Sequence, residues 1–183
     1  FHWIYKVKII SLYVKMKILV TGGAGYVGSI LISDLIKKHD VVCLDRFFFG
    51  KDYLSQEKFV NRVELIQDDI RWFNPKFLEQ IDLVIDLAAM SNDPSGELDP
   101  DKTFDINYLG RTRVAKLSKK FGVKRYILAS SASVYGFQEN IVNEESTTNP
   151  LTTYSKSAQL AELDILPLDD DDFTVTVLRF GTL

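Results

Sequence analysis

A glycine-rich segment separates the first apolar run of this chain from its first amphipathic stretch. The segment reads Thr21-Gly-Gly-Ala-Gly-Tyr-Val-Gly28, so glycines stand at 22, 25 and 28. Gly22 allows a tight turn, Gly25 lets the backbone approach a pyrophosphate, and Gly28 lets a helix pack closely on a sheet. A helix start also attracts phosphates through its free N–H groups and its positive dipole end. The segment therefore predicts a dinucleotide site, with a tight turn that binds no ligand as the alternative.

Short apolar runs alternate with helical stretches along the rest of the chain. The expected strands are Lys17–Thr21, Val41–Asp45, Val63–Gln67, Leu83–Ala88, Tyr126–Ser130 and Thr174–Arg179. The expected helices are Tyr26–Lys38, roughly Thr103–Phe121, and one that begins near Thr153. Near-continuous apolar strands between helices predict a parallel sheet that is covered on both faces. The fold class is therefore a Rossmann-type, doubly wound α/β domain, whose ligands bind beyond the carboxyl ends of the strands.

The second expected strand ends in Asp45, close to the distance of about 20 residues at which an acidic residue holds an adenosine ribose. This carboxylate would repel a 2'-phosphate, so NAD is favoured over NADP. Arg46 follows at once and weakens the argument, because an arginine there would reach a phosphate. An NADP-dependent reductase therefore stays open, as does a plain strand-end carboxylate at Asp45.

The composition is that of an ordinary globular domain. The chain of 183 residues is 46% apolar with a net charge of -3, and its basic residues form no long run, so no nucleic-acid partner is expected. The single cysteine, Cys43, excludes a disulfide framework and a paired-cysteine metal site and indicates a reducing cytoplasm. The acidic run Asp169–Asp172 is interpreted as a solvated loop, so no metal is expected.

The first fifteen residues, FHWIYKVKIISLYVK, are apolar but too short to span a bilayer, and they lack the features of a signal peptide. We expect Met16 to be the true start and residues 1–15 to be an upstream or non-native extension. An extra edge strand and a membrane-surface segment are the alternatives, and no membrane partner is expected. Residues 16–183 show no repeat or linker and are interpreted as one domain.

Further motifs follow in order: Asp69-Ile-Arg71, Leu87-Ala-Ala89, Asn107, Ser130-Ser-Ala-Ser-Val-Tyr-Gly136 and the segment around Tyr154. With the glycine segment and Asp45, they resemble the extended short-chain dehydrogenase/reductases, specifically the NAD-dependent nucleotide-sugar epimerases and dehydratases. The resemblance covers residues 16–183 and implies NAD as cofactor and a nucleotide-sugar as substrate, with a homodimer as an option. Family members continue into a smaller substrate-binding domain, which is largely absent here, and Thr182 stands where relatives often carry asparagine.

The resemblance also implies roles for single residues. Ser131 and Tyr154 would be catalytic, and Ser133 would face the substrate. Asp69 and Ile70 would hold the adenine, and Asn107 would support the site from its helix. The implied cofactor-binding residues are Gly22, Gly25, Tyr26, Val27, Gly28, Asp45, Arg46, Asp69, Ile70, Leu87, Ala88, Ala89 and Asn107. The alternatives are a helix-surface polar residue at Asn107 and merely strand-end hydroxyls at Ser130 and Ser131.

The implied chemistry is a transient oxidation. A tyrosinate takes a proton from a sugar hydroxyl while a hydride passes to NAD, and the serine hydroxyl binds the reacting oxygen. The keto intermediate is then re-protonated, loses water, or rotates and is reduced again. NAD is regenerated in each cycle.

One position departs from the family pattern. The pattern places a lysine four residues after the tyrosine, but Ala158 stands there. Lys156, two residues after Tyr154, points roughly 200° around the helix and cannot substitute. A free tyrosine has a pKa of about 10 and needs a neighbouring cation to act as a base at neutral pH. An active epimerase or dehydratase and an NAD-binding, non-catalytic or weakly active fragment of the same fold therefore both stay open.

Overall fold

Within residues 14–181, which the computed structural model describes, six parallel strands form one sheet. They are β1 (Lys17–Thr21), β2 (Asp40–Asp45), β3 (Val63–Gln67), β4 (Leu83–Asp86), β5 (Arg125–Ser131) and β6 (Thr174–Phe180). Most of the N-terminal segment interpreted as an extension, and Thr182, lie outside the described residues.

The strand order is β3-β2-β1-β4-β5-β6, with every neighbouring pair parallel. The chain runs outward from β1 to β3, crosses back to β4 and continues outward to β6. The order therefore reverses between β1 and β4, where doubly wound sheets bind their ligands. Because all strands are parallel, their carboxyl ends share one edge. The predicted fold class is confirmed.

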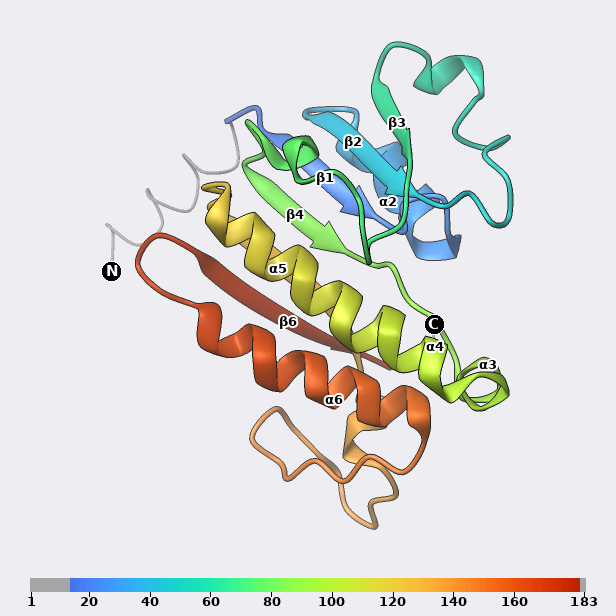
Figure 1. Cartoon of the computed structure of the whole chain (residues 1–183), viewed down its shortest axis with the longest axis vertical. Coiled ribbons are helices and arrows are strands. Elements are labelled where there is room, and N and C mark those ends of the chain that lie inside the picture. The colour runs from blue at the N-terminus through green and yellow to red at the C-terminus, as the bar shows by residue number, and fades with distance from the viewer. Residues whose placement is uncertain (1–13, 182–183) are drawn as a thin grey trace.

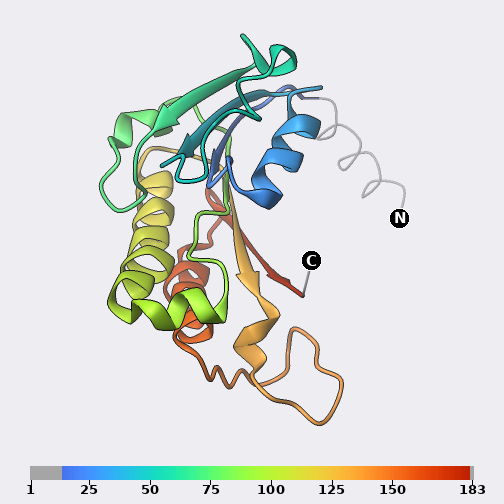
Figure 2. The same ribbon diagram turned by 90° about the vertical axis from the view of Figure 1, so that its right-hand side faces the viewer.

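Helices cover the sheet from two sides. Figure 2 shows α2 (Tyr26–Leu35) on one side of the sheet and α5 (Arg111–Lys120) with α6 (Thr153–Ile165) on the other. Two short helices, α3 (Asp93–Leu98) and α4 (Pro100–Phe104), precede α5 (Figure 1). The remaining turns are η1 (Glu57–Phe59), η2 (Pro75–Leu78), η4 (Ala132–Tyr135), η5 (Leu166–Leu168) and the π-helical η3 (Asp105–Gly110).

Successive residues of a strand point to opposite faces of the sheet, and both kinds are buried because helices cover both faces. On β1, Leu19 belongs to the core beneath α5 and α6. Its neighbours Ile18 and Val20 belong to the core beneath α2, together with Ile32 and Cys43. This double burial explains why the strands are apolar along their whole length rather than alternating.

Three element boundaries differ by more than one residue from the sequence-based expectation. Helix α2 ends at Leu35, and the chain then forms turns up to residue 38. Strand β4 ends at Asp86. The Leu87 N–H still bonds to the Thr21 carbonyl on β1, whereas the Ala88 N–H bonds to the Thr21 hydroxyl. The helix expected from Thr103 begins at Pro100, after Asp99 caps its first turn by accepting from the Lys102 N–H. None of the helices between residues 14 and 181 is long and apolar enough to cross a membrane.

We predict that Cys43 resists alkylation until the protein unfolds. Its side chain is fully buried, and burial, aided by the charge of Asp45, raises the pKa of the thiol from 9.0 to about 12. Because the folded-state pKa is raised, the linked stability is complete below pH 9.0 and is lost as the pH rises toward 12. Iodoacetamide labelling at pH 8, followed by mass spectrometry across a urea series, should track unfolding. Labelling in native buffer at the rate of a free thiol would contradict this prediction.

Candidate active site

The turn after β1 requires a glycine at position 22. Gly22 has φ +65°, and its N–H donates to the Leu44 carbonyl at 2.9 Å. A Cβ there would lie 2.7 Å from the Ala88 N atom and 2.9 Å from the Leu87 carbonyl carbon. The turn therefore packs directly on the backbone that follows β4.

The start of α2 has the features of a pyrophosphate site. A Cβ on Gly28 would lie 2.6 Å from the Gly22 carbonyl oxygen, so α2 packs closely on the turn. Gly25 is the N-cap and has no side chain to accept from the first-turn N–H groups. A Cβ on Gly25 would meet only the Gly22 carbonyl oxygen, at 3.2 Å. The predicted site residues Tyr26 and Val27 open this helix, whose N–H groups and dipole suit a phosphate.

Two backbone N–H groups orient the Asp45 carboxylate at the end of β2. Oδ2 accepts from the Ala24 N–H in the glycine turn at 3.0 Å, and Oδ1 accepts from the Phe47 N–H at 2.7 Å. Each carboxylate oxygen can accept a second hydrogen bond, so Asp45 keeps capacity for two hydroxyls. The residues present thus fit a ribose beside the glycine turn.

Asp69 holds two arginines next to this position. Arg71 donates to both carboxylate oxygens, at 3.0 and 2.9 Å, and the Arg46 Nε lies 3.4 Å from Oδ2. Burial opposes ionisation of Asp69, but the hydrogen bonds and charge of Arg71 outweigh it and lower the pKa of the carboxyl. The guanidinium on which the NADP alternative rests is therefore drawn toward Asp69. Ile70, the other predicted adenine residue, is buried against the backbone of Gly110.

A buried polar network joins β1 to β4 where the strand order reverses. The Thr21 hydroxyl donates to Asp86 at 2.5 Å and accepts from the Ala88 N–H at 3.3 Å. The Tyr126 hydroxyl also donates to the Asp86 carboxylate. The Arg111 Nη2 donates to the Asp86 carbonyl at 3.1 Å, and its Nε lies 3.7 Å from the carboxylate. Burial, followed by the charge of Asp86, raises the pKa of Tyr126 well above its usual value.

Sequence reasoning missed Asp86 and Arg111. A signal was present, because Asp86 ends the otherwise apolar run Leu-Val-Ile-Asp, and a carboxylate in such a run needs a partner. Its partner lies 25 residues away on α5, which no local pattern reveals.

Asn107 is buried in the π-helical segment η3, so it is not a helix-surface residue. Its Oδ1 accepts from the Met90 N–H at 2.8 Å, and its Nδ2 donates to the Met90 carbonyl at 3.0 Å. The side chain thus fixes the chain directly after the Leu87–Ala89 segment. Single π-helical turns inside α-helices are frequent at functional sites.

The predicted catalytic residues lie at the same edge of the sheet. Ser131 ends β5, and its Oγ accepts from the Ser133 N–H at 3.1 Å. The Oγ of Ser133 is buried and has no hydrogen-bond partner within residues 14–181. Tyr154 lies in the first turn of α6, which packs against β5 and η4. The structure therefore brings α6 and the end of β5 together beside the loops that follow β1 and β4.

A second buried network ties α6 to the sheet, and sequence reasoning missed it as well. Glu162, which is 2% exposed, accepts from Ser130 and from Arg179, whose Nη2 lies 2.7 Å away. Arg179 on β6 also donates to the Tyr135 hydroxyl at 2.9 Å, and its hydrogen bonds to Glu162 raise the pKa of the guanidinium. The helix that carries Tyr154 is thus fixed to β5, β6 and η4.

Ala158 is buried against η4, where it packs with Val134 and Tyr135. Lys156 is exposed, in agreement with its expected direction away from the site. The position at which the family pattern places an ammonium is therefore apolar in this chain.

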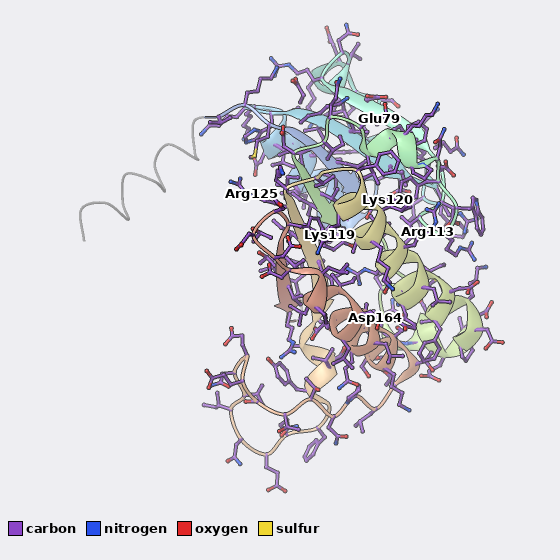
Figure 3. The ribbon with its side chains drawn as sticks, turned by 60° about the vertical axis from the view of Figure 1, so that its left-hand side comes forward. Glu79, Arg113, Lys119, Lys120, Arg125 and Asp164 are labelled. Atoms are coloured by element: carbon purple, nitrogen blue, oxygen red, sulfur yellow. The ribbon has the colours of Figure 1, made fainter. Side chains whose placement is uncertain are left out.

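Lys119 and Lys120 lie at the C-terminal end of α5, at the opposite end of the helix from the buried Arg111 (Figure 3). Lys119 pairs with Asp170 at 2.7 Å, and Lys116 lies 3.9 Å from Asp164. Acidic side chains therefore neutralise part of the basic surface of α5. Among residues 14–181, no group of three or more His, Cys, Asp or Glu side chains is arranged to bind a metal ion.

Comparison with known proteins identifies the family. The model of the NAD dependent epimerase/dehydratase family matches residues 18–183. This chain belongs to that family. The resemblance to the extended short-chain dehydrogenase/reductases is thereby confirmed, as is NAD as the cofactor of the family. The residue roles and the domain boundaries stay predictions.

The relatives act on nucleotide-sugars, as their names state. UDP-glucose 4-epimerase of Lactobacillus helveticus is 32% identical over 172 residues, which cover 90% of this chain and 51% of that protein. UDP-glucuronic acid decarboxylase 1 of Danio rerio is 33% identical and is matched over 85% of this chain and 38% of its own length. The UDP-glucose-4-epimerase structure of Stenotrophomonas maltophila, with bound NAD and formylated UDP-arabinopyranose, superposes with a TM-score of 0.83 at 28% identity, over 90% of this chain and 52% of that one. The chain thus spans about half the length of the epimerases it matches.

We predict that Asp86→Asn destabilises the protein far more than Asp82→Asn does. The first change leaves the buried Arg111 guanidinium without its carboxylate, at a cost of about 3–5 kcal/mol. The second removes the same charge from an exposed residue just before the same strand, where it accepts from the Lys17 N–H. Urea unfolding of both variants measures the difference. Equal shifts in the two unfolding midpoints would show that the buried pair of Asp86 and Arg111 adds no more to the free energy of unfolding than the exposed Asp82 does.

Proposed function

We propose that the protein acts on a nucleotide-sugar as an NAD-dependent epimerase or dehydratase. The observation that carries this proposal is the convergence at one sheet edge of the glycine turn, the segment after β4, Ser131, and the helix start that bears Tyr154. The names of the relatives, which are UDP-sugar epimerases and decarboxylases, support the substrate class.

The placement of the predicted cofactor-binding residues supports the roles that we propose for them. The turn at Gly22, Gly25 and Gly28 would receive the pyrophosphate, and Asp45 the adenosine ribose. Asp69 and Ile70 would border the adenine, and the Leu87–Ala89 segment, fixed at Met90 by Asn107, would run along the cofactor. Bound NAD supplies the hydride acceptor and donor of the reaction.

Ser131 and Tyr154 would handle the proton of the reacting sugar hydroxyl. The Ser131 Oγ already accepts from the Ser133 N–H, which leaves its own proton free to donate to the sugar oxygen. Tyr154 would accept the hydroxyl proton and later return it. Ser133, whose hydroxyl has no hydrogen-bond partner in the part of the chain that the structure describes, lies two residues from Ser131 and would bind a further substrate oxygen.

The apolar surroundings of Ala158 favour a second candidate function, an NAD-binding protein with weak or no turnover. No ammonium at this position assists Tyr154 or bonds the nicotinamide ribose. The two candidates share the cofactor site and differ only in catalysis.

The cytoplasm is the proposed location, because the buried, free Cys43 suits a reducing compartment. A homodimer stays open, and residues 16–183 are proposed as one NAD-binding domain.

We predict that Ala158→Lys raises turnover of a UDP-sugar at least about tenfold, because an ammonium beside Tyr154 favours the tyrosinate. The product of the complete reading frame would be incubated with UDP-glucose, UDP-N-acetylglucosamine and UDP-glucuronic acid, and the products identified by mass spectrometry and NMR.

Ala158→Met is the matched control, because it adds a side chain of similar bulk without the charge. A gain confined to the lysine variant supports the catalytic proposal. No conversion of any UDP-sugar by either the natural protein or the lysine variant would eliminate it and leave the binding function.

A further inference from the structure

The first turn of α6 is held by acidic side chains of α3. Glu97 Oε1 accepts from the Thr153 N–H at 2.7 Å, and Asp93 accepts from the hydroxyl of Thr152, the N-cap of α6. Thr152 also forms a capping box with Ser155. Two carboxylates at the positive end of a helix dipole are favourable, and these two come from a separate helix (Figure 1).

Gly96 brings α3 against Tyr154 itself. A Cβ on Gly96 would lie 3.2 Å from the Tyr154 Cβ and 3.3 Å from its backbone N atom. The Gly96 carbonyl in turn accepts from the fully buried Thr103 hydroxyl at 3.1 Å. Helix α3 is thus wedged between α4 and the residue that would carry the proton.

The same helix continues from the segment that follows β4. Asn107 fixes Met90, and Asn92 caps α3 by accepting from the Ser95 N–H at 2.8 Å. Only three residues, 90–92, separate the end of the Leu87–Ala89 segment from the start of α3. Asn107 and Asn92 thus hold the two ends of this short connection. The hydrogen bond from Thr153 lowers the pKa of Glu97, so this side chain is a carboxylate at neutral pH.

We propose that Asp93 and Glu97 are positioning residues, which hold the first turn of α6 and thereby fix Tyr154 relative to the segment after β4. The catalytic consequence rests on the proposed function, whereas the effect on Tyr154 does not. Neither residue belongs to the predicted site set, and both act only through α6.

The direct test is NMR on the isotopically labelled 183-residue chain with saturating NAD. Glu97→Ala should make the Thr153 amide exchange about tenfold faster or more, because the amide loses its acceptor. The three-bond couplings that report χ1 of Tyr154 should change from a single rotamer toward an average. Gly96→Ala, which crowds Tyr154 without removing a carboxylate, should also shift these couplings.

Asp101→Ala is the control, since it removes an exposed carboxylate from the neighbouring α4. Glu97→Gln keeps an oxygen acceptor for Thr153 and should restore most of the protection. Tyr154 couplings and Thr153 exchange in Glu97→Ala that match those of Asp101→Ala would overturn the proposal.

Measurements of kcat and KM distinguish a failure of the positioning proposal from a failure of the proposed function. In the product of the complete reading frame, Glu97→Ala should lower kcat by about 10- to 100-fold with KM for the nucleotide-sugar unchanged, because only the proton-transfer geometry is disturbed. An unchanged kcat in a variant with averaged Tyr154 couplings would contradict the positioning role. A lack of turnover in both the natural protein and the Ala158→Lys variant would defeat the proposed function, and the couplings alone would then decide the positioning claim.

Discussion

The hydrogen bond from Thr21 to Asp86 joins β1 to β4 at the point where the strand order reverses, and the candidate site depends on it. The two strands carry the turn at Gly22 and the segment that begins at Leu87, which must lie almost in contact. Asp86 is fully buried, so its charge is tolerated only because Arg111, Tyr126 and Thr21 surround it. The polar network therefore sets the spacing of the two loops between which a dinucleotide would lie.

Much of this arrangement follows from local sequence. Glycines at fixed spacing between an apolar run and an amphipathic stretch determine the first βαβ unit, because each glycine meets a steric demand of that turn. Asp45 was placed correctly at the end of β2, since strand ends can be read from where apolar runs stop. The alternation of strands and helices then defined the fold class.

The parts that escaped prediction depend on contacts between distant segments. Glu162 reads locally as one more charged helix residue, yet it is buried because Ser130 and Arg179 meet it from two strands. The π-helical turn at Asn107 and the short helix α3 have no periodic pattern. Their conformations are fixed by tertiary partners such as Met90 and Thr153. The residues that support a site are therefore harder to predict from the sequence than the residues that would contact its ligands.

Ala158 affects the proposed catalytic part of the site and leaves the proposed cofactor-binding part unchanged. On the side proposed to bind the cofactor, the structure has a constrained turn, a helix start without a side-chain cap and an oriented carboxylate. On the side of α6, the same helix is capped, clamped by α3 and tied to the sheet, while the position one turn after Tyr154 is apolar. The proposed cofactor binding therefore rests on more of the described residues than the proposed catalysis does.

Isothermal titration of the 183-residue chain with NAD and with NADP tests that central claim most directly. The glycine turn and the Asp45 carboxylate predict one NAD bound per chain, and NADP about tenfold or more weaker, because its 2'-phosphate would face Asp45. An absence of NAD binding, or equal affinity for the two dinucleotides, would contradict the account.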